Sequence, residues 1–390
     1  MDPVEFKMPE GVELKINPRQ FLGKTEEKPE ALAALSPESQ AGLRQYSLER
    51  MTGYGVDYAD AVELRARIVS GEDWQKAAED LALGALDSAN SLTSETSRAR
   101  LNHRASALLR MSQALMLHDT DQRREIVQRA VDSYTTATKL GSKRDHVDIA
   151  TPEGTMSGWF VEAAGEEAIG SAIVIGGVEG WAMDFDGLGE EMAARGIDTL
   201  LLDAPGQGET RILNGHFLTA KWMESFRRAI DFCEQRTRGK PIGLVGNSMG
   251  GAITIAMANN DTRVAACINN GGIFRPSLAR MAGPTFFQKM VAFTGLEGDD
   301  AEHRAAEIWD TIEPLRPGLN SNYPLLVVQG GQDMLVFDDH AKIFMALTPA
   351  GEKEMEYFSD GIHCIYNHLS DRDIVMSDWM RARLLDAGNA

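Results

Sequence analysis

Two stripes of largely apolar residues in the first third of the chain follow the spacing of amphipathic helices. They comprise Leu101, Ala105, Leu108, Ser112 and Leu115, and then Ile126, Ala130, Val131, Tyr134 and Ala137. Arg, Gln, Asp and Glu occupy the positions between them, so each stripe forms one helix face. We therefore expect an all-helical module of four or five helices over residues 31–141, in which Asp119 and Gln122 cap the second of these helices.

After Gly141 short apolar runs replace the helical period. Residues 146–150 and 156–162 predict a hairpin around Pro152-Glu153-Gly154. Buried strands are expected at 171–175, 198–202, 241–246, 264–269, 324–329 and 353–358, and helices at 184–195, 217–237, 249–259, 338–347 and 366–386. Strands that alternate with helices predict an α/β fold with a mostly parallel sheet covered on both faces. Ligands of such open sheets bind at the carboxyl ends of the strands.

These patterns divide the chain into three parts. Residues 1–30 contain four prolines and little periodicity, and we expect an extended N-terminal arm there. The helical module over 31–141 follows, and then an α/β catalytic domain over 142–390. Residues 273–322 interrupt the strand-helix alternation of that domain with prolines, Met281 and several phenylalanines. This insertion is either a lid over an apolar pocket or ordinary core packing.

Composition restricts the partners of the chain. Of 390 residues, 43% are hydrophobic and 25% are charged, which is typical of globular proteins. The formal net charge of −19 repels phosphate backbones and anionic membranes, so we expect a small-molecule substrate and neither nucleic acid nor membrane. The three cysteines are too scattered for a disulfide framework, and no signal peptide or membrane span is recognisable. A cytoplasmic location is expected.

Gly246-Asn247-Ser248-Met249-Gly250 ends an apolar run and begins a helix-compatible one. A serine at such a strand-to-helix turn is a nucleophile elbow, because the strained backbone lifts its hydroxyl above the sheet. The N–H of the following residue then faces any oxyanion formed there. Ser248 is accordingly the candidate nucleophile.

A serine needs a base and a group that orients the base. In this fold the acid and then the histidine follow the serine. Asp333 follows the strand at 324–329 and is the leading acid, although a turn-stabilising role is the alternative; Asp338 and Asp339 are expected to cap the next helix. His363 lies just past the last strand and is the expected base. Its rival His368 is expected inside the C-terminal helix.

The loop Gly176-Gly177-Val178-Glu179-Gly180-Trp181 follows the strand at 171–175. The amides of Met249 and Val178 are the expected oxyanion-hole donors. Glu179 and Trp181 are candidate substrate-binding residues, although Glu179 could instead face solvent or pair with an arginine. Gly206-Gln207-Gly208-Glu209 lacks the spacing of a phosphate loop and predicts a tight turn near the site. No cluster at metal-ligand spacing is recognisable, so neither metal nor cofactor is expected.

Four strings resemble one branch of the α/β-hydrolases: Gly176-Gly177-Val178-Glu179, Asp203-Ala204-Pro205-Gly206-Gln207-Gly208-Glu209, Gly246-Asn247-Ser248-Met249-Gly250-Gly251 and Gly361-Ile362-His363-Cys364. That branch contains 2,6-dihydroxypseudooxynicotine hydrolase, the fermentation-respiration switch protein and fungal enzymes that shorten polyketides. Asp57-Tyr58-Ala59-Asp60 and Asp73-Trp74 are similar to its helical module, so the resemblance covers most of the chain.

The resemblance implies an α/β-hydrolase fold with a helical cap, a homodimer, and Ser248, Asp333 and His363 as the triad. It also implies that Glu179 assists the cleavage of a carbon–carbon bond beside an aryl ketone. Val178, Gly180 and Trp181 depart from the pattern of the branch, which implies a different pocket and substrate.

Three hypotheses follow. The first is a serine hydrolase that cleaves a carbon–carbon bond of a ketone or β-diketone-like small molecule, with Glu179 binding or protonating the leaving portion. The second is a carboxylesterase or amidase that uses the same triad without Glu179. The third is a non-catalytic regulatory protein of hydrolase fold.

Overall fold

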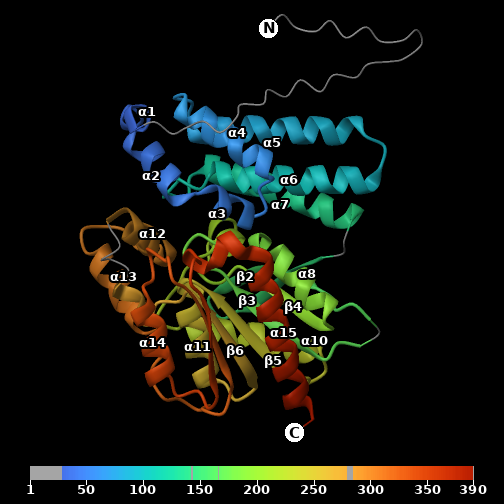
Figure 1. The fold of residues 1–390 in the computed structure, drawn as a ribbon, viewed down its shortest axis with the longest axis vertical. Helices are drawn as coiled ribbons and strands as arrows, with labels where there is room; N and C mark the ends of the chain where they lie inside the picture. Colours follow the sequence, from blue (N-terminus) through green and yellow to red (C-terminus); the bar gives the residue numbers. More distant parts are fainter. Residues whose placement is uncertain (1–28, 142–143, 166, 279–283, 390) are drawn as a thin grey trace, which may run out of the picture.

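The computed structural model describes residues 29–141, 144–165, 167–278 and 284–389. Its first part is helical, and Figure 1 shows these helices lying together over one end of the sheet. They are α1 (Pro29–Ala33), α2 (Pro37–Gln45), α3 (Leu48–Gly53), α4 (Tyr58–Val69), α5 (Trp74–Ser91), α6 (Glu95–Ser112) and α7 (Asp121–Leu140). The expectation of a helical module is confirmed, but the expected number of helices was too small. The first three helices are five to nine residues long, too short to show a periodic pattern.

Side-chain caps explain where most of these helices begin. Ser36, Ser47, Asp57, Asp73, Ser94 and Thr120 each accept a hydrogen bond from a backbone N–H of the first turn. Such caps satisfy donors that the helix itself leaves unpaired. The expected cap at Asp119 was wrong by one residue, because Thr120 caps α7 and Asp119 accepts from two arginines instead.

The α/β part contains one eight-stranded sheet with the order β1-β2-β4-β3-β5-β6-β7-β8. The strands are β1 (Asp145–Thr151), β2 (Gly154–Val161), β3 (Gly170–Ile175), β4 (Ile197–Leu202), β5 (Ile242–Asn247), β6 (Val264–Asn270), β7 (Leu325–Gly330) and β8 (Lys353–Phe358). The β1–β2 and β2–β4 pairs are antiparallel and all others are parallel. In the register, Val174 lies between Leu201 and Val245. Every expected strand is present, and the predicted hairpin is β1–β2.

Helices cover both faces of this sheet, as expected from the alternation (Figure 1). They are α8 (Asp186–Ala194), α9 (Gly208–Ile212), α10 (Trp222–Arg236), α11 (Met249–Asn260), α12 (Pro284–Thr294), α13 (Ala301–Asp310), α14 (Asp338–Leu347) and α15 (Leu369–Gly388), with 3-10 turns η1 (Ala182–Phe185) and η3 (His363–His368). One buried cluster joins the sheet to α10 and α11, and another joins it to α8 and α15. Among the described residues, no helix combines the length and apolarity needed to cross a membrane.

The expected N-terminal arm is not tested by the structure, and one expected helix begins later than predicted. The arm over 1–30 lies almost entirely outside the described residues, and its last two residues begin α1. The helix expected over 217–237 begins only at Trp222. Residues 217–221 are not helical, and the N–H of Leu218 donates to the carbonyl oxygen of Phe293 at 2.8 Å, outside the helix.

The excursion over 273–322 contains α12 and α13. Phe287, Met290 and Phe293 are buried in the core, as the packing alternative expected. Leu278 and Phe286 instead line the cavity beside Ser248. Met281 lies outside the described residues. The described part of the excursion therefore both fills the core and covers the cavity.

Candidate active site

Ser248 lies at the turn between β5 and α11, with φ 54° and ψ −124°. A non-glycine residue in this region is strained, and such strain persists only where the surroundings enforce it. The flanking glycines permit the turn: a Cβ on Gly246 would lie 2.3 Å from the carbonyl oxygen of Gly250, and one on Gly250 would lie 2.5 Å from that of Ile175. The local backbone is that of a nucleophile elbow.

The structure brings Ser248, His363 and Asp333 together from three separate strand ends. The Nε2 atom of His363 lies 2.9 Å from the Oγ of Ser248, and its Nδ1 lies 2.8 Å from the Oδ2 of Asp333. The Oδ1 of Asp333 accepts from the N–H groups of Leu335 and Val336, each at 2.8 Å. Asp333 therefore has both of the roles considered for it. Its Oδ1 stabilises the turn, and its Oδ2 faces the imidazole of His363.

His363 is half-buried beside these partners, with its side chain 12% exposed. Burial opposes a charge on the imidazole, but the electrostatic influence of Cys364 and Asp333 outweighs it, and the pKa of His363 is raised above its ordinary value. A carboxylate at Nδ1 also fixes the tautomer that leaves Nε2 free to accept a proton.

The rival residues lie elsewhere. His368 ends η3, and its Nε2 lies 2.9 Å from Asp360 rather than near the serine. Asp338 and Asp339 occupy the first turn of α14, but the expected caps are absent: the N-cap is Phe337, with no side-chain cap. Asp338 accepts from the Tyr357 hydroxyl at 3.1 Å instead.

A cavity of about 510 Å³ opens beside Ser248. Its lining includes His363, the loop residues Gly177, Val178 and Glu179, and Met249. Most of the remaining wall is apolar or aromatic and comprises Tyr54, Ile273, Leu278, Phe286, Met334, Leu335, Val336, Phe337 and Tyr366. A mostly apolar cavity with a few polar groups at one end is typical of small-molecule sites.

The loop after β3 lies against the serine. A Cβ on Gly177 would lie 2.7 Å from the Cβ of Ser248, so this approach requires a glycine. The side-chain amide of Gln207 donates to the carbonyl oxygens of Gly176 and Gly177, at 2.8 and 2.6 Å. Its own oxygen accepts from the N–H of Ala204 at 3.1 Å. The turn predicted at Gly206-Gln207-Gly208 is therefore coupled to the loop that carries Val178.

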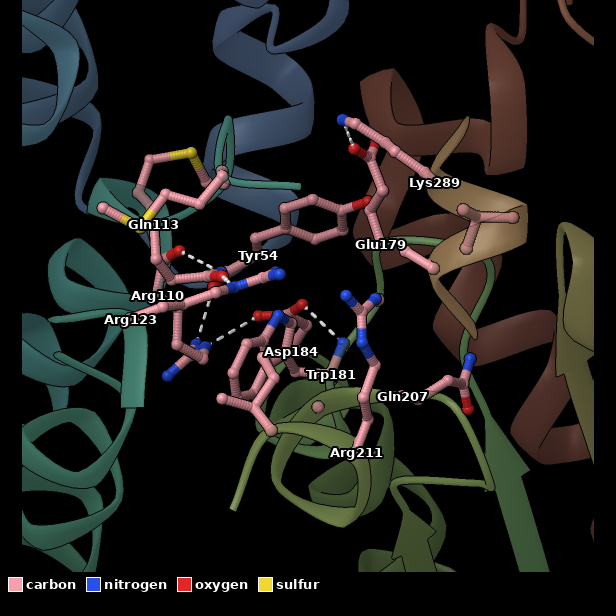
Figure 2. Close-up of a pocket in the computed structure, with 18 of the residues that line it drawn as sticks. Tyr54, Arg110, Gln113, Arg123, Glu179, Trp181, Asp184, Gln207, Arg211 and Lys289 are labelled. Carbon is pink, nitrogen blue, oxygen red and sulfur yellow. Dashed lines mark hydrogen bonds and ion pairs between the residues drawn. The ribbon is translucent and has the colours of Figure 1, made fainter. Parts of the chain in front are cut away.

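The Glu179 side chain is only 8% exposed and contacts three donors. Its carboxylate accepts from the Tyr46 hydroxyl at 3.1 Å and from the Arg50 guanidinium at 3.2 Å, and it contacts the Lys289 ammonium. Figure 2 shows Lys289 reaching Glu179 from α12. The arginine-paired alternative raised from the sequence is the one seen, and it links the helical module, the core and the excursion through one carboxylate.

Trp181 does not line the cavity beside Ser248. Its side chain is buried in the core, and its backbone N–H donates to Asp184 at 2.8 Å. Asp184 in turn pairs with the buried Arg110 of α6 at 3.0 Å. Trp181 lines a second, smaller chamber of about 60 Å³, shown in Figure 2, which shares Tyr54, Val178 and Glu179 with the larger cavity.

One described group has the composition of a metal site. His146, Asp148 and Glu209 each offer an atom within 4.8 Å of the others, away from the cavity. All three residues already have protein partners. His146 and Glu209 contact each other, with Nε2 of His146 3.0 Å from Oε1 of Glu209. Asp148 accepts from the Ser157 hydroxyl at 2.8 Å.

Sequence reasoning did not identify the residues that surround Glu179. Tyr46, Arg50 and Lys289 are separated from it by more than one hundred positions, and ordinary arginines and lysines carry no local signal of such contacts. Gln207 did carry a signal, because it lies between two glycines in a string that predicted a tight turn and contributed to the family resemblance. The sequence alone assigned no role to Gln207 itself.

Comparisons with known proteins agree with this architecture. Residues 166–296 match the family described as serine aminopeptidase, S33. A curated 2,6-dihydropseudooxynicotine hydrolase from Paenarthrobacter nicotinovorans is 23% identical over 344 residues, covering 84% of this chain and 88% of the relative. The crystal structure of a 2,6-dihydroxy-pseudo-oxynicotine hydrolase superposes with a TM-score of 0.76 at 22% identity, covering 88% of this chain and 97% of that one.

The structure of wild-type AbyA5 superposes with a TM-score of 0.67 at 15% identity and covers 88% of this chain and 99% of that one. These similarities extend over the helical module as well as the sheet. The chain has the α/β-hydrolase fold with an N-terminal helical module. The family match over residues 166–296 and the curated relative support a hydrolase.

Proposed function

We propose that this protein is a serine hydrolase that cleaves a carbon–carbon bond of a ketone or β-diketone-like small molecule. The observation that carries the proposal is the hydrogen-bonded series from Ser248 through His363 to Asp333 at the wall of the 510 Å³ cavity. Nucleophile, base and orienting acid lie within hydrogen-bond reach, as nucleophilic catalysis requires.

In the first step Ser248 Oγ attacks the substrate carbonyl carbon and gives its proton to Nε2 of His363. The amides of Val178 and Met249, both at the cavity wall, receive the oxyanion. Collapse of this intermediate breaks the carbon–carbon bond, and the imidazolium returns the proton to the leaving carbon. Water then attacks the acyl-serine with His363 as base, which releases a carboxylic acid and restores the serine.

The contacts of Glu179 change the role first considered for it. A carboxylate that accepts from Tyr46 and Arg50 and contacts Lys289 acts as an acceptor, so we assign the proton transfer to His363. Glu179 lines both the cavity and the chamber, and there it binds and orients the leaving portion.

Carbon–carbon cleavage needs a leaving carbanion that is delocalised, since a carbanion leaves less readily than an alkoxide. Support for such a substrate comes from the aromatic wall of the cavity and from a curated relative named for the hydrolysis of 2,6-dihydropseudooxynicotine. A carboxylesterase or amidase is the second candidate, because the same three residues serve an ester and the apolar wall accepts an acyl chain.

The test is a screen of aryl 1,3-diketones, lactones and p-nitrophenyl esters with product identification, run on wild type and Glu179→Gln. The proposal expects diketone cleavage to a carboxylic acid and a ketone, lost by at least about tenfold in Glu179→Gln while ester turnover persists. Ester turnover alone, with no diketone cleaved and no effect of Glu179→Gln, would establish the esterase instead.

A further inference from the structure

The small chamber behind Glu179 has a surplus of positive charge. Four cationic side chains, Arg110, Arg123, Arg211 and Lys289, line it, against the two acidic side chains of Glu179 and Asp184. This is opposite in sign to the whole chain, whose formal net charge is −19. Cations gathered in a partly closed space favour an anionic ligand.

The ion pairs around the chamber do not remove this surplus. Arg110 and Asp184 compensate each other at 3.0 Å. Asp119, in contrast, is shared by Arg123 at 3.0 Å and Arg211 at 2.9 Å. Glu179 is likewise shared, by Arg50 and Lys289. Two carboxylates thus serve four basic side chains. Burial and the charges of Arg50 and Arg123 lower the pKa of Lys289 to about 7, so the positive charge that remains uncompensated is that of the two arginines that share Asp119.

Donor atoms are also left over. Arg123 uses its Nε on Gln113 and its Nη1 on Asp119 and the Leu117 carbonyl. Arg211 uses its Nε and Nη2 on Asp119, and its Nη2 also on the Leu117 carbonyl. Within the described part of the chain, the Nη2 of Arg123 and the Nη1 of Arg211 have no hydrogen-bond partner. Neither of these two atoms is fully buried.

The two guanidinium groups affect each other. Burial and the charge of Arg211 lower the pKa of Arg123 to about 10. Two buried like charges in mutual contact with one carboxylate are costly, and an anion bound between them relieves that cost. Figure 2 shows the guanidinium of Arg211 rising toward the middle of the chamber, with Glu179 and Lys289 beyond it.

We propose that the chamber binds a carboxylate group through Arg123 and Arg211. A volume of about 60 Å³ has room for a group of this size, and guanidinium groups match the planar carboxylate. Tyr54, Val178 and Glu179 line both the chamber and the cavity, so the two spaces adjoin. The proposal therefore requires that a substrate whose carbonyl lies at Ser248 passes a short chain between these side chains to the arginines. This inference rests on the proposed function for its reacting carbonyl.

The carboxylate can belong to the substrate or to a free carboxylic acid, and two experiments distinguish these sources. The first compares the mono-p-nitrophenyl esters (hemiesters) of succinate, glutarate and adipate with the same compounds in which the free carboxylate is a methyl ester (methyl diesters). If the carboxylate belongs to the substrate, the kcat/KM of wild type is at least about tenfold higher for the hemiester of fitting length than for its methyl diester. Arg211→Gln lowers this ratio to about one. Arg211→Gln leaves Asp119 paired with Arg123, so it creates no lone buried carboxylate. The control variant is Arg316→Gln, which removes one positive charge from an exposed position and should keep the wild-type ratio of hemiester to diester turnover.

The second experiment needs no turnover. Acetate and glutarate are titrated calorimetrically into Ser248→Ala and into the double variant with Arg211→Gln. Binding that Arg211→Gln removes, together with a hemiester ratio near one in wild type, assigns the chamber to a free carboxylate. No Arg211-dependent binding and no hemiester preference would overturn the proposal. A failure of the hydrolase function is separate, because it is seen as no turnover of any ester and no labelling of Ser248 by a fluorophosphonate.

Discussion

The side-chain amide of Gln207 lies 2.6 Å from the carbonyl oxygen of Gly177. That carbonyl and the N–H of Val178 belong to one planar peptide group and point in opposite directions. By holding the Gly177 oxygen, Gln207 therefore determines where the Val178 N–H points. This N–H is the expected oxyanion donor, and Gln207 is a positioning residue for it.

Substituting Gln207→Leu removes this constraint while it keeps a similar side-chain volume. We expect kcat to fall by about 10²-fold with little change in KM, because a misdirected oxyanion donor affects the transition state more than substrate binding. Steady-state kinetics on a p-nitrophenyl ester measures this. The exposed Gln128→Leu is the control, and a rise in KM at unchanged kcat would argue against the positioning role.

Gly177→Ala tests the close approach of the loop to the nucleophile. The added Cβ would lie 2.7 Å from the Cβ of Ser248, so loop or serine must move. We expect turnover and fluorophosphonate labelling to fall by more than about 100-fold. Gly84→Ala is the matched control, because nothing lies within 4 Å of that position and alanine stabilises a helix interior by about 0.5–1 kcal/mol. Equal labelling of both variants would contradict the geometry.

The pH dependence of kcat/KM reports on His363. Since the neutral imidazole is the base and the pKa of His363 is raised, activity is lost as the pH falls through a midpoint above 6.5. Asp333→Asn removes the carboxylate, which lowers this midpoint and reduces kcat by on the order of 10³–10⁴-fold. Asp339→Asn, on an exposed side chain, keeps the wild-type profile. A midpoint that Asp333→Asn leaves unchanged would exclude the pairing.

The buried pair of Arg110 and Asp184 joins the helical module to the core. Arg110→Met leaves Asp184 as an unpaired buried carboxylate, and we expect the free energy of unfolding to fall by about 3–5 kcal/mol. Adding Asp184→Asn should restore part of it, as chemical denaturation would show. Arg124→Met breaks an exposed pair and should change stability by less than about 1 kcal/mol. Equal effects of Arg110→Met and Arg124→Met would count against this account.

The sheet and the three residues around Ser248 were predictable because their signals are local. Continuous apolar runs such as 171–175 are typical of strands buried on both faces, and the structure has β3 there. Ser248, Asp333 and His363 each follow such a run, and the carboxyl ends of parallel strands meet at one edge. Their order along the chain then restricted the choice of acid and base.

The surroundings of Glu179 were not predictable from one sequence. Tyr46 and Arg50 reach it from the helical module and Lys289 reaches it from α12, so the contacts depend on how three distant segments pack. The prediction of the α7 cap was wrong for a smaller reason. Asp119 and Thr120 are both good cap residues, but Asp119 pairs with Arg123 and Arg211, and Thr120 caps the helix.

The central claim is that Ser248 is activated by His363, and a fluorophosphonate probe followed by intact-mass and peptide mass spectrometry tests it most directly. The account predicts one adduct on Ser248 in wild type, none in Ser248→Ala, and labelling at least about 100-fold slower in His363→Ala. The absence of an adduct on folded wild-type protein, or equally fast labelling of His363→Ala, would contradict it.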